Sequence, residues 1–379
     1  MFRAKNNFFI KMTQKTIITG GHASPALAVI DELQITKPEY EIYFLGRKFN
    51  NSNDSELSFE YKEIKLRKIP FYNLNTGRLM RSISFETLQN LFLTVRGFIH
   101  SWQIINKIRP KIILSFGGYL ALPVTIMGWL YGATIYTHEQ TIHPGITNRI
   151  ISVFAKNIFI SFPQSVSFFP KSKTILTGNP IRKSLMHKSN TNRYESNLDT
   201  IYITGGSLGS HSLNVHIENI LQELLKKYFV IHQTGNVSEY DDFKRLTKLK
   251  EGLNEKERLR YKLISHVDSR EIADVYATSD IVISRSGANT VSELIALRIP
   301  AVLVPLPWSA NDEQKKHAEL LENAGVAEVF DQEKPSEILL KLIQKVMMKR
   351  DSYEKNYSKL ENYSSPNAAA AIIETVFKK

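Results

Sequence analysis

A repeating order of short β-branched runs, glycine-bearing turns and helix-periodic segments constrains the fold of this chain more than any other feature. The runs lie at residues 16–18, 42–45, 112–114 and 134–136 in the first half, and at 200–203, 229–232, 281–284 and 301–304 in the second. Strands that alternate with helices build parallel sheets covered by helices on both faces. The sequence therefore predicts an α/β fold.

Two domains are expected from the length of the chain and from a short internal sequence similarity. The 379 residues, 42% of them hydrophobic, exceed one ordinary core and suffice for two. The turn Thr19-Gly20-Gly21-His22 after the first strand resembles Thr204-Gly205-Gly206-Ser207 after the strand at 200–203. Two Rossmann-like halves would place these turns across one cleft, and chance similarity of two short turns is the alternative.

The domain boundary is predicted at the polar stretch that follows Gly178-Asn179-Pro180. We expect an N-terminal domain over residues 1–183, a linker over 184–197, a C-terminal domain over 198–350 and a helical tail over 351–379.

The excess of positive charge lies entirely in the first half. The chain has 49 Lys and Arg against 37 Asp and Glu; residues 1–183 hold 23 against 10, or +13, and residues 184–379 hold 26 against 27, or −1. A basic half favours an anionic partner, namely nucleic acid, acidic lipid or a phosphorylated substrate. A solvated basic surface is the alternative, and the aromatic residues form no recognisable platform for nucleic-acid bases.

A basic amphipathic stretch in the same half favours a membrane surface. Its apolar residues are Leu79, Ile83, Leu88, Leu91, Phe92, Val95, Ile99 and Trp102, interleaved with Arg78, Arg81, Arg96 and Lys107. This pattern is typical of an interfacial helix or, equally, of a helix packed on a sheet. No run is long enough to span a bilayer, and residues 1–14 are too weakly apolar for a signal peptide. The absence of cysteine removes thiol chemistry and is compatible with a reducing cytoplasm.

Both Gly-Gly turns suit an anion, because a helix N-terminus offers free N–H groups and glycine lets a phosphate approach the backbone. Neither is a dinucleotide fingerprint or a P-loop. His22 follows the first turn, where an imidazole could take a proton from a substrate hydroxyl, cap the helix or bind phosphate.

Further polar groups follow other strands, at the edge where open α/β sheets bind ligands. They are Tyr119 in Ser115-Phe116-Gly117-Gly118-Tyr119, and His138-Glu139-Gln140, whose adjacent positions favour a hydrogen-bonding network over a metal site. Glu293, one turn into the helix after Ser284-Arg285-Ser286-Gly287, could accept ribose hydroxyls or complement the helix N-terminus. The loop ending in Asn311-Asp312-Glu313-Gln314 could read a sugar.

These motifs together resemble the lipid I N-acetylglucosaminyltransferase (MurG) family of peptidoglycan synthesis, in glycosyltransferase family 28, from about Thr16 to Val329. Six groups of residues carry the resemblance in the family's order: Thr19-Gly20-Gly21-His22 with Pro25-Ala26-Leu27-Ala28; Phe116-Gly117-Gly118-Tyr119; His138-Glu139-Gln140 with Pro144-Gly145 and Thr147-Asn148-Arg149; Gly178-Asn179-Pro180 with Arg182; Gly205-Gly206-Ser207 with Gly209; and Arg285-Ser286-Gly287-Ala288 with Thr290-Val291-Ser292-Glu293.

The resemblance implies a GT-B fold, two Rossmann-like domains facing across a cleft, and an inverting transfer of N-acetylglucosamine from UDP to lipid I without a metal or other cofactor. It implies His22 as catalytic base, a lipid-linked pyrophosphate acceptor, and a peripheral location at the cytoplasmic face of the bacterial plasma membrane. The implied donor-binding residues are Thr19, Gly20, Gly21, Thr141, Arg182, Ser207, Ala288, Asn289, Thr290, Val291, Ser292, Glu293 and Gln314. The implied acceptor-side residues are Tyr119, His138, Glu139 and Gln140.

The chain departs from the family pattern at Ile17 and Ile18, where two glycines are usual, and at Thr141 and Glu313, where Asn and Gln are usual. These positions bear on phosphate contact and donor-sugar selectivity, and the uracil contact near residues 266–271 stays unassigned. The alternatives within the fold are a glycolipid glycosyltransferase and a UDP-N-acetylglucosamine 2-epimerase, which would convert the donor without an acceptor. A nucleic-acid-binding protein would leave the two glycine turns unexplained.

Overall fold

The computed structural model describes residues 14–49, 57–74, 76–77, 85–186, 197–206, 208–235, 239–268 and 271–378. By internal contacts the chain divides into two compact units, one formed by Met1–His138 with Gly145–Ile158 and the other by Glu139–Pro144 with Phe159–Lys379. The predicted boundary near residues 184–197 stays a prediction, and residues 187–196 lie outside the described ones.

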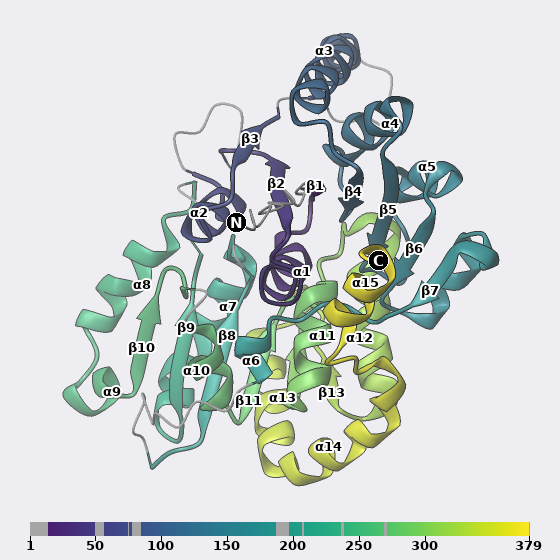
Figure 1. The fold of residues 1–379 in the computed structure, drawn as a ribbon. Helices are drawn as coiled ribbons and strands as arrows, with labels where there is room; N and C mark the ends of the chain where they lie inside the picture. The colour runs from purple at the N-terminus through teal and green to yellow at the C-terminus, as the bar shows by residue number, and fades with distance from the viewer. Residues whose placement is uncertain are drawn as a thin grey trace, which may run out of the picture. The chain divides into compact units, whose positions relative to one another are not determined.

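Two parallel sheets form the framework of the chain, which confirms the predicted α/β class (Figure 1). The first sheet has the order β3-β2-β1-β4-β5-β6-β7 and the second the order β10-β9-β8-β11-β12-β13. The strands of the first are β1 Gln14–Thr19, β2 Tyr40–Gly46, β3 Phe71–Asn73, β4 Ile112–Ser115, β5 Thr134–Glu139, β6 Asn157–Ile160 and β7 Thr174–Leu176. Those of the second are β8 Thr200–Thr204, β9 Phe229–Gln233, β10 Tyr261–Ile264, β11 Ile281–Ser284, β12 Ala301–Leu303 and β13 Ala327–Val329.

Helices connect these strands. Along the first half they are α1 Ala23–Thr36, α2 Phe59–Leu66, α3 Phe85–Ile108, α4 Ala121–Tyr131, α5 Ile146–Phe154 and α6 Lys183–Met186, with 3-10 turns at Pro163–Phe168 and Lys171–Lys173. The second half adds α7 His211–Leu225, α8 Asp242–Glu251, α9 Glu255–Leu259, α10 Ile272–Ala277, α11 Ala288–Leu297, α12 Glu313–Ala324, α13 Ser336–Met348, α14 Arg350–Asn356 and α15 Ala368–Val376, with 3-10 turns at Ala310–Asp312 and Tyr357–Tyr363.

The eight predicted strands are all present, and the structure adds β3, β6, β7, β10 and β13. The central strands carry the strongest sequence signal because helices cover both their faces. All five residues of β8 and all four of β11 are buried. Of the added strands, β3, β7, β10 and β13 are the edges of the two sheets, and most of their residues are only partly buried, so they show no continuous apolar run.

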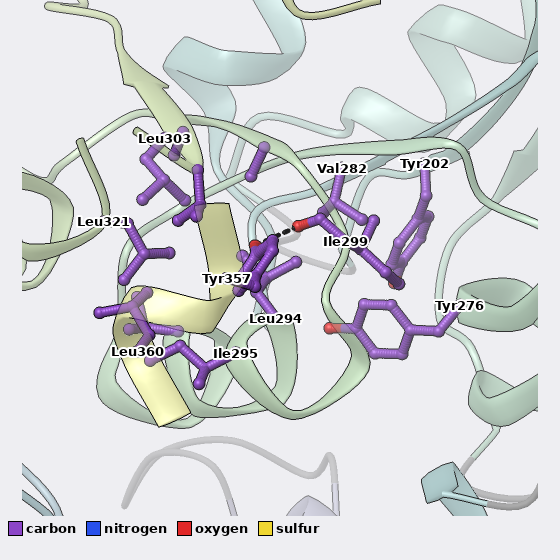
Figure 2. Close-up of a cluster of buried hydrophobic side chains, with 14 of the residues drawn as sticks. Tyr202, Tyr276, Val282, Leu294, Ile295, Ile299, Leu303, Leu321, Tyr357 and Leu360 are labelled. Carbon is purple, nitrogen blue, oxygen red and sulfur yellow. Dashed lines mark hydrogen bonds between the residues drawn. The ribbon is translucent and has the colours of Figure 1, made fainter. Parts of the chain in front are cut away.

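Apolar residues of the second sheet contribute to two buried clusters. One cluster includes side chains of α7 and α13. The other, called the α11 cluster, includes side chains of α11 and α12, such as Leu294 and Leu321. Figure 2 shows the α11 cluster, in which the Tyr357 hydroxyl donates a hydrogen bond to Ile299 O at 2.5 Å. Tyr202 of β8 and Tyr276 of α10 lie at the edge of this cluster with their rings edge to face, 5.6 Å apart. These two tyrosines connect the core to the candidate site.

Candidate functional site

Two glycine turns of the first unit are locked together by their backbones. Gly21, after β1, donates its N–H to Gly117 O at 3.0 Å, and Phe116 N donates to Thr19 O at 2.8 Å. A Cβ on Gly21 would lie 2.8 Å from Gly118 Cα, and Gly117 and Gly118 have φ values of 72° and 77°. Only glycine fits this approach, since both a side chain and an L-residue conformation are disfavoured there. The turns predicted from the sequence therefore form one structure at the ends of β1 and β4.

His22 occupies the N-cap position of α1, but its side chain makes no capping hydrogen bond. Burial lowers the pKa of the imidazole to about 4, because the charged form loses hydration. The ring is therefore neutral at pH 7 and has a free lone pair to accept a proton. Thr19 lies fully buried three residues earlier, and its Oγ1 has no hydrogen-bond partner among the described residues. An orphan hydroxyl beside a glycine turn is a candidate ligand contact.

Asn148 of α5 braces this edge of the sheet, a role that sequence reasoning missed. Its Nδ2 donates to His138 O at 3.1 Å, and its Oδ1 accepts from Thr137 Oγ1 at 2.8 Å. A Cβ on Gly117 would lie 2.9 Å from Asn148 Nδ2, so the amide packs directly on the glycine turn. His138 is fully buried with its ring 5.5 Å from that of Phe116. The Pro-Gly-x-x-Asn spacing after His138 was the available signal.

Tyr119 directly follows the Gly117-Gly118 turn and is half-buried. The guanidinium carbon of Arg47, after β2, lies 5.7 Å from the centre of the Tyr119 ring, within cation–π range. The structure thus adds a cation beside a predicted acceptor-side residue.

The segment Glu139–Pro144 belongs by its contacts to the second unit, although it directly follows β5. Thr141 Oγ1 lies 2.7 Å from Glu139 Oε1, and Thr141 N donates to the same carboxylate oxygen at 3.0 Å. Gln140 is 1% exposed, and its Oε1 lacks a hydrogen-bond partner in the described part of the chain. Three predicted site residues are thus consecutive and buried, and one of them has an unused acceptor.

The glycine turn of the second unit, which contains Gly205, Gly206 and Gly209, connects β8 to α7. Gly205 and Gly209 are fixed by close backbone contacts: a Cβ on Gly209 would lie 2.0 Å from Thr234 O, and one on Gly205 would lie 2.3 Å from Ser210 N. Gly206 O accepts a bond from Gln233 Nε2 at 3.1 Å. The turn precedes the N-terminus of a 15-residue helix, where free N–H groups favour an anion. Ser207 lies outside the described residues.

Glu293, on α11, lies between an aromatic hydroxyl and a guanidinium. The Tyr276 hydroxyl donates to Glu293 Oε2 at 2.9 Å. Burial raises the pKa of Glu293, and the positive charge of Arg182 and the bond from Tyr276 partly offset that rise. Arg182 is 8% exposed, so it is a largely desolvated cation. Tyr276 anchors one oxygen of this half-buried carboxylate. The sequence did not reveal this contact, because Tyr276 lies 17 residues before Glu293 in the chain.

The Tyr276 anchor is connected to the glycine turn by a chain of buried polar contacts. Tyr276 packs edge to face on Tyr202 (Figure 2). The Tyr202 hydroxyl donates to Gln233 Oε1 at 2.7 Å. Gln233 in turn donates to Gly206 O. Buried hydrogen bonds and ring packing of this kind rigidify the groups that they join. The carboxylate of Glu293 and the turn before α7 are therefore held in one fixed arrangement.

The first turn of α11 is held partly from outside the helix. Asn289 Oδ1 accepts from Asn179 Nδ2 at 3.1 Å, so the Gly178-Asn179-Pro180 motif is attached to the helix start. Ser292 Oγ donates to Ala288 O at 2.8 Å, and the Val291 side chain is buried in the α11 cluster. Ala288 is also buried, whereas Asn289 and Thr290 are half-buried.

Gln314, in the first turn of α12, ties two loops together. Its Oε1 accepts from Leu306 N at 3.0 Å, and its backbone O accepts from Ser286 Oγ at 2.7 Å. Burial, together with the negative charge of Glu139, raises the pKa of the neighbouring Glu313 to about 7. The site thus has a carboxylate that titrates near neutrality.

Arg285, after β11, is a buried cation whose hydrogen bonds all go to neutral acceptors. It donates to Ser210 and Ser212 at the start of α7, to Val304 O and Pro305 O after β12, and to Gln332 Oε1. Burial lowers its pKa to about 10, so it stays charged at pH 7. Its charge adds to the positive end of α7.

Neither a metal cluster nor a membrane span is found within the described ranges. No group of three or more His, Asp or Glu side chains there could hold a metal ion. No helix in those ranges is both long enough and apolar enough to cross a bilayer. That the reaction needs no metal stays a prediction.

Comparison with known proteins finds matches to two family models, one for each half. Residues 16–160 match the glycosyltransferase family 28 N-terminal domain, and residues 200–374 match the glycosyltransferase family 28 C-terminal domain. Among curated relatives, a UDP-N-acetylglucosamine--N-acetylmuramyl-(pentapeptide) pyrophosphoryl-undecaprenol N-acetylglucosamine transferase of Bacillus cereus is 31% identical over 96% of this chain and 99% of its own length. The enzyme of the same name from Clostridium perfringens is 33% identical over 89% of this chain and 92% of its own length.

Solved structures share the fold along nearly the whole chain. The crystal structure of Acinetobacter baumannii MurG has a TM-score of 0.68 at 24% identity and covers 97% of this chain and 100% of its own. A UDP-GlcNAc 2-epimerase from Neisseria meningitidis bound to UDP-GlcNAc has a TM-score of 0.66 at 15% identity, with the same coverage of 97% and 100%. At these identities the structural likeness concerns the fold alone.

Proposed function

This chain belongs to glycosyltransferase family 28, and within it to the MurG family, and from that membership we propose that it transfers N-acetylglucosamine from UDP-N-acetylglucosamine to lipid I. Lipid I is undecaprenyl-pyrophosphoryl-N-acetylmuramyl-peptide, and the product is lipid II of peptidoglycan synthesis. The observation that carries the proposal is that similarity to transferases named for this reaction extends through both halves of the chain. An epimerase is not favoured, because its likeness to this chain is one of fold.

We propose that the second unit binds the donor. Glu293 accepts the ribose hydroxyls through the oxygen that Tyr276 leaves available, with its other oxygen already anchored at 2.9 Å. The diphosphate lies at the glycine turn before α7, where Ser207, the helix N-terminus and the buried charge of Arg285 offset its negative charge. Gln314, Thr141 and the start of α11 from Ala288 to Ser292 contact the sugar and the diphosphate, and Arg182 completes the charge balance.

We propose that the acceptor binds to the N-terminal half of the chain and that transfer is a single inverting displacement. The acceptor hydroxyl oxygen forms a bond to the anomeric carbon as the bond from that carbon to the diphosphate oxygen breaks, and UDP leaves with the electron pair. His22 takes the hydroxyl proton, which its neutral imidazole can accept at pH 7. Thr19, Gly20 and Gly21, which precede His22, contact the donor, while Tyr119, His138, Glu139 and Gln140 contact the acceptor. No metal or other cofactor enters this scheme.

The test of this proposal is UDP release from UDP-N-acetylglucosamine, measured with and without a short-chain lipid I analogue. We expect release only when the analogue is present. Release with simple glycolipids alone would identify a glycolipid glycosyltransferase, and conversion of the donor without any acceptor would identify an epimerase. A Glu293→Gln variant is the matched control, because it keeps the shape of the side chain and loses the charge that we assign to ribose binding.

We further propose that the first unit contacts an anionic membrane surface through an apolar patch on α3, α4 and α5. The three helices lie side by side (Figure 1). The rings of Trp102 and Tyr131 pack edge to face with centres 6.3 Å apart, and those of Trp129 and Phe154 are tilted with centres 5.6 Å apart, so aromatic contacts connect neighbouring helices. The exposed members of the patch are Leu93, Val95, Ile99, Trp102, Trp129, Leu130, Ile146, Ile150 and Val153.

Three of these residues, Val95, Ile99 and Trp102, come from the amphipathic stretch predicted from sequence. Leu79, Ile83, Arg78 and Arg81, and the side chains of Leu88, Leu91 and Phe92, lie outside what the structure describes. Arg96 on α3 and Arg149 on α5 are exposed beside the patch. Apolar side chains rimmed by arginine are typical of a surface that binds acidic lipid headgroups. We propose a peripheral location at the cytoplasmic face of the bacterial plasma membrane, and this patch supports the contact with a membrane surface.

Sedimentation with vesicles tests the membrane proposal. We expect the protein to pellet with vesicles containing anionic phospholipid, and expect Val153→Glu, at a site 75% exposed, to weaken that binding at least tenfold. Ile35→Glu on α1 is the matched control, because Ile35 is 72% exposed in the same unit and lies outside the patch. Equal binding by both variants would contradict the proposal.

A further inference from the structure

His317 of α12 is a fully buried histidine that the proposed reaction does not use. Its Nε2 lies 3.2 Å from Ile142 N, and its Nδ1 lies 3.2 Å from Ser286 O. Its ring stacks on that of Phe162 with centres 5.1 Å apart and 28° between the planes. One side chain therefore bridges two backbone groups that are 144 residues apart, the N–H of Ile142 and the carbonyl of Ser286.

The two partners determine the tautomer of the imidazole. A backbone N–H can only donate, so Nε2 of His317 accepts from Ile142, and a carbonyl can only accept, so Nδ1 carries the proton and donates to Ser286. The ring must be neutral for both bonds to exist. Burial lowers the pKa of His317 to about 4, so this form persists at neutral pH.

On one side, His317 holds the segment Glu139–Pro144 on the second unit. Ser165 supports the same segment, since its Oγ lies 2.8 Å from Thr141 O and 3.2 Å from Ile142 O. The Ile142 side chain enters the α11 cluster, and the His143 ring packs on Phe168 at 4.4 Å. His317 nevertheless supplies the acceptor for the Ile142 N–H, the backbone donor that lies directly after Glu139, Gln140 and Thr141.

On the other side, His317 is attached to the loops around the proposed donor site. Ser286, which accepts the Nδ1 proton through its carbonyl, donates its hydroxyl to Gln314 O at 2.7 Å. Gln314 accepts from Leu306 N. His317 is thus one hydrogen bond from the turn that precedes α11, two from Gln314 and three from the loop that precedes α12.

We propose that His317 is a positioning residue, which holds the Glu139–Thr141 group in register with the Ser286–Gln314 turns by a single tautomer-specific bridge. The inference rests on the proposed function for the roles of those residues, whereas the bridge itself is a statement about contacts. Because His317 touches neither the proposed donor nor the acceptor, its loss should alter how Glu139, Gln140 and Thr141 are presented and leave binding of UDP nearly intact.

The direct test is hydrogen exchange of the Ile142 amide in the full-length protein. His317→Leu replaces the imidazole with an apolar side chain of similar volume and removes both nitrogens, so we expect exchange at Ile142 to accelerate at least tenfold. His317→Gln offers one acceptor and one donor, so we expect its exchange rate to lie near the parent's. If the Leu variant does not fold, the Gln variant still decides, because tenfold faster exchange there would overturn the bridge.

His232 of β9 provides the matched control. It is also fully buried in the second unit, burial lowers its pKa to about 3, and both its nitrogens are hydrogen-bonded, to Tyr261 and Asn214. His232→Leu should therefore lower the melting temperature as His317→Leu does, without accelerating exchange at Ile142. Acceleration of equal size in the two variants would show general loosening and would overturn the proposal.

Activity separates the positioning role from the proposed function. We expect His317→Leu to lower kcat/KM for the lipid I analogue at least tenfold and to change the Kd for UDP less than threefold. Parent-like kcat/KM, or a loss of UDP affinity as large as the loss of transfer, would overturn the positioning role. If the parent protein itself does not transfer sugar, the proposed function fails, and the exchange measurement still decides whether His317 holds the segment.

Discussion

Gly21→Ala tests the locked glycine turns on which the first half of the site is built. The new Cβ would lie 2.8 Å from Gly118 Cα, whereas carbon atoms in ordinary contact are about 3.5 Å or more apart. The two backbones must therefore separate by about 0.7 Å. The bond from Gly21 N to Gly117 O, now 3.0 Å, would then exceed the length of an effective hydrogen bond.

The magnitude follows from these two effects. Overpacking and loss of one buried bond together cost about 1–3 kcal/mol, which lowers the melting temperature by roughly 3 to 10 °C for a domain of this size. Displacement of the adjacent His22 by about two thirds of an ångström should lower kcat roughly 10- to 100-fold.

Thermal unfolding and turnover with the lipid I analogue measure the two effects separately. Gly145→Ala is the control, because a Cβ there meets nothing within 4 Å and the backbone has an ordinary φ of −66°. We expect that variant to melt and turn over like the parent. If Gly21→Ala did the same, the backbone contact between the turns would have no bearing on the site, and our reasoning from it would be refuted.

Three further substitutions test individual groups. His22→Ala should lower kcat about 100-fold or more while the Kd for UDP, measured by titration calorimetry, stays within about twofold, since only a base is lost; a parent-like kcat would remove His22 from the chemistry. Tyr276→Phe should raise the Kd for UDP about tenfold, because a hydrogen bond to a carboxylate contributes about 1.5 kcal/mol, and an unchanged Kd would show that Glu293 needs no anchor. Glu313, with its folded pKa raised to about 7, favours the folded state below pH 4.5 and loses that contribution as pH rises through 7. Glu313→Gln should therefore melt above the parent at pH 8 and no higher at pH 5; a difference independent of pH would contradict the shifted pKa.

The sequence was sufficient for the central strands and for the turns, because those features are local. A buried parallel strand is a continuous apolar run, and a tight turn needs glycine, so both can be recognised within a few residues. Tyr276, Asn148 and His317 could not be assigned in this way. Each acts through a contact that only the folded chain creates, such as that between His317 and Ile142, 175 residues apart. The strands β7 and β13 were missed because they are edge strands, whose residues are mostly only partly buried and so form no continuous apolar run.

The place of Glu139–Pro144 in the second unit has a consequence for engineering by exchange of halves. A chimera cut in the linker at 184–197 would take α12 from one parent and this six-residue segment from the other. The Ile142 amide and its acceptor on His317 would then come from different parents. A working chimera must carry the segment with its own α12, which makes the exchangeable module discontinuous in the gene.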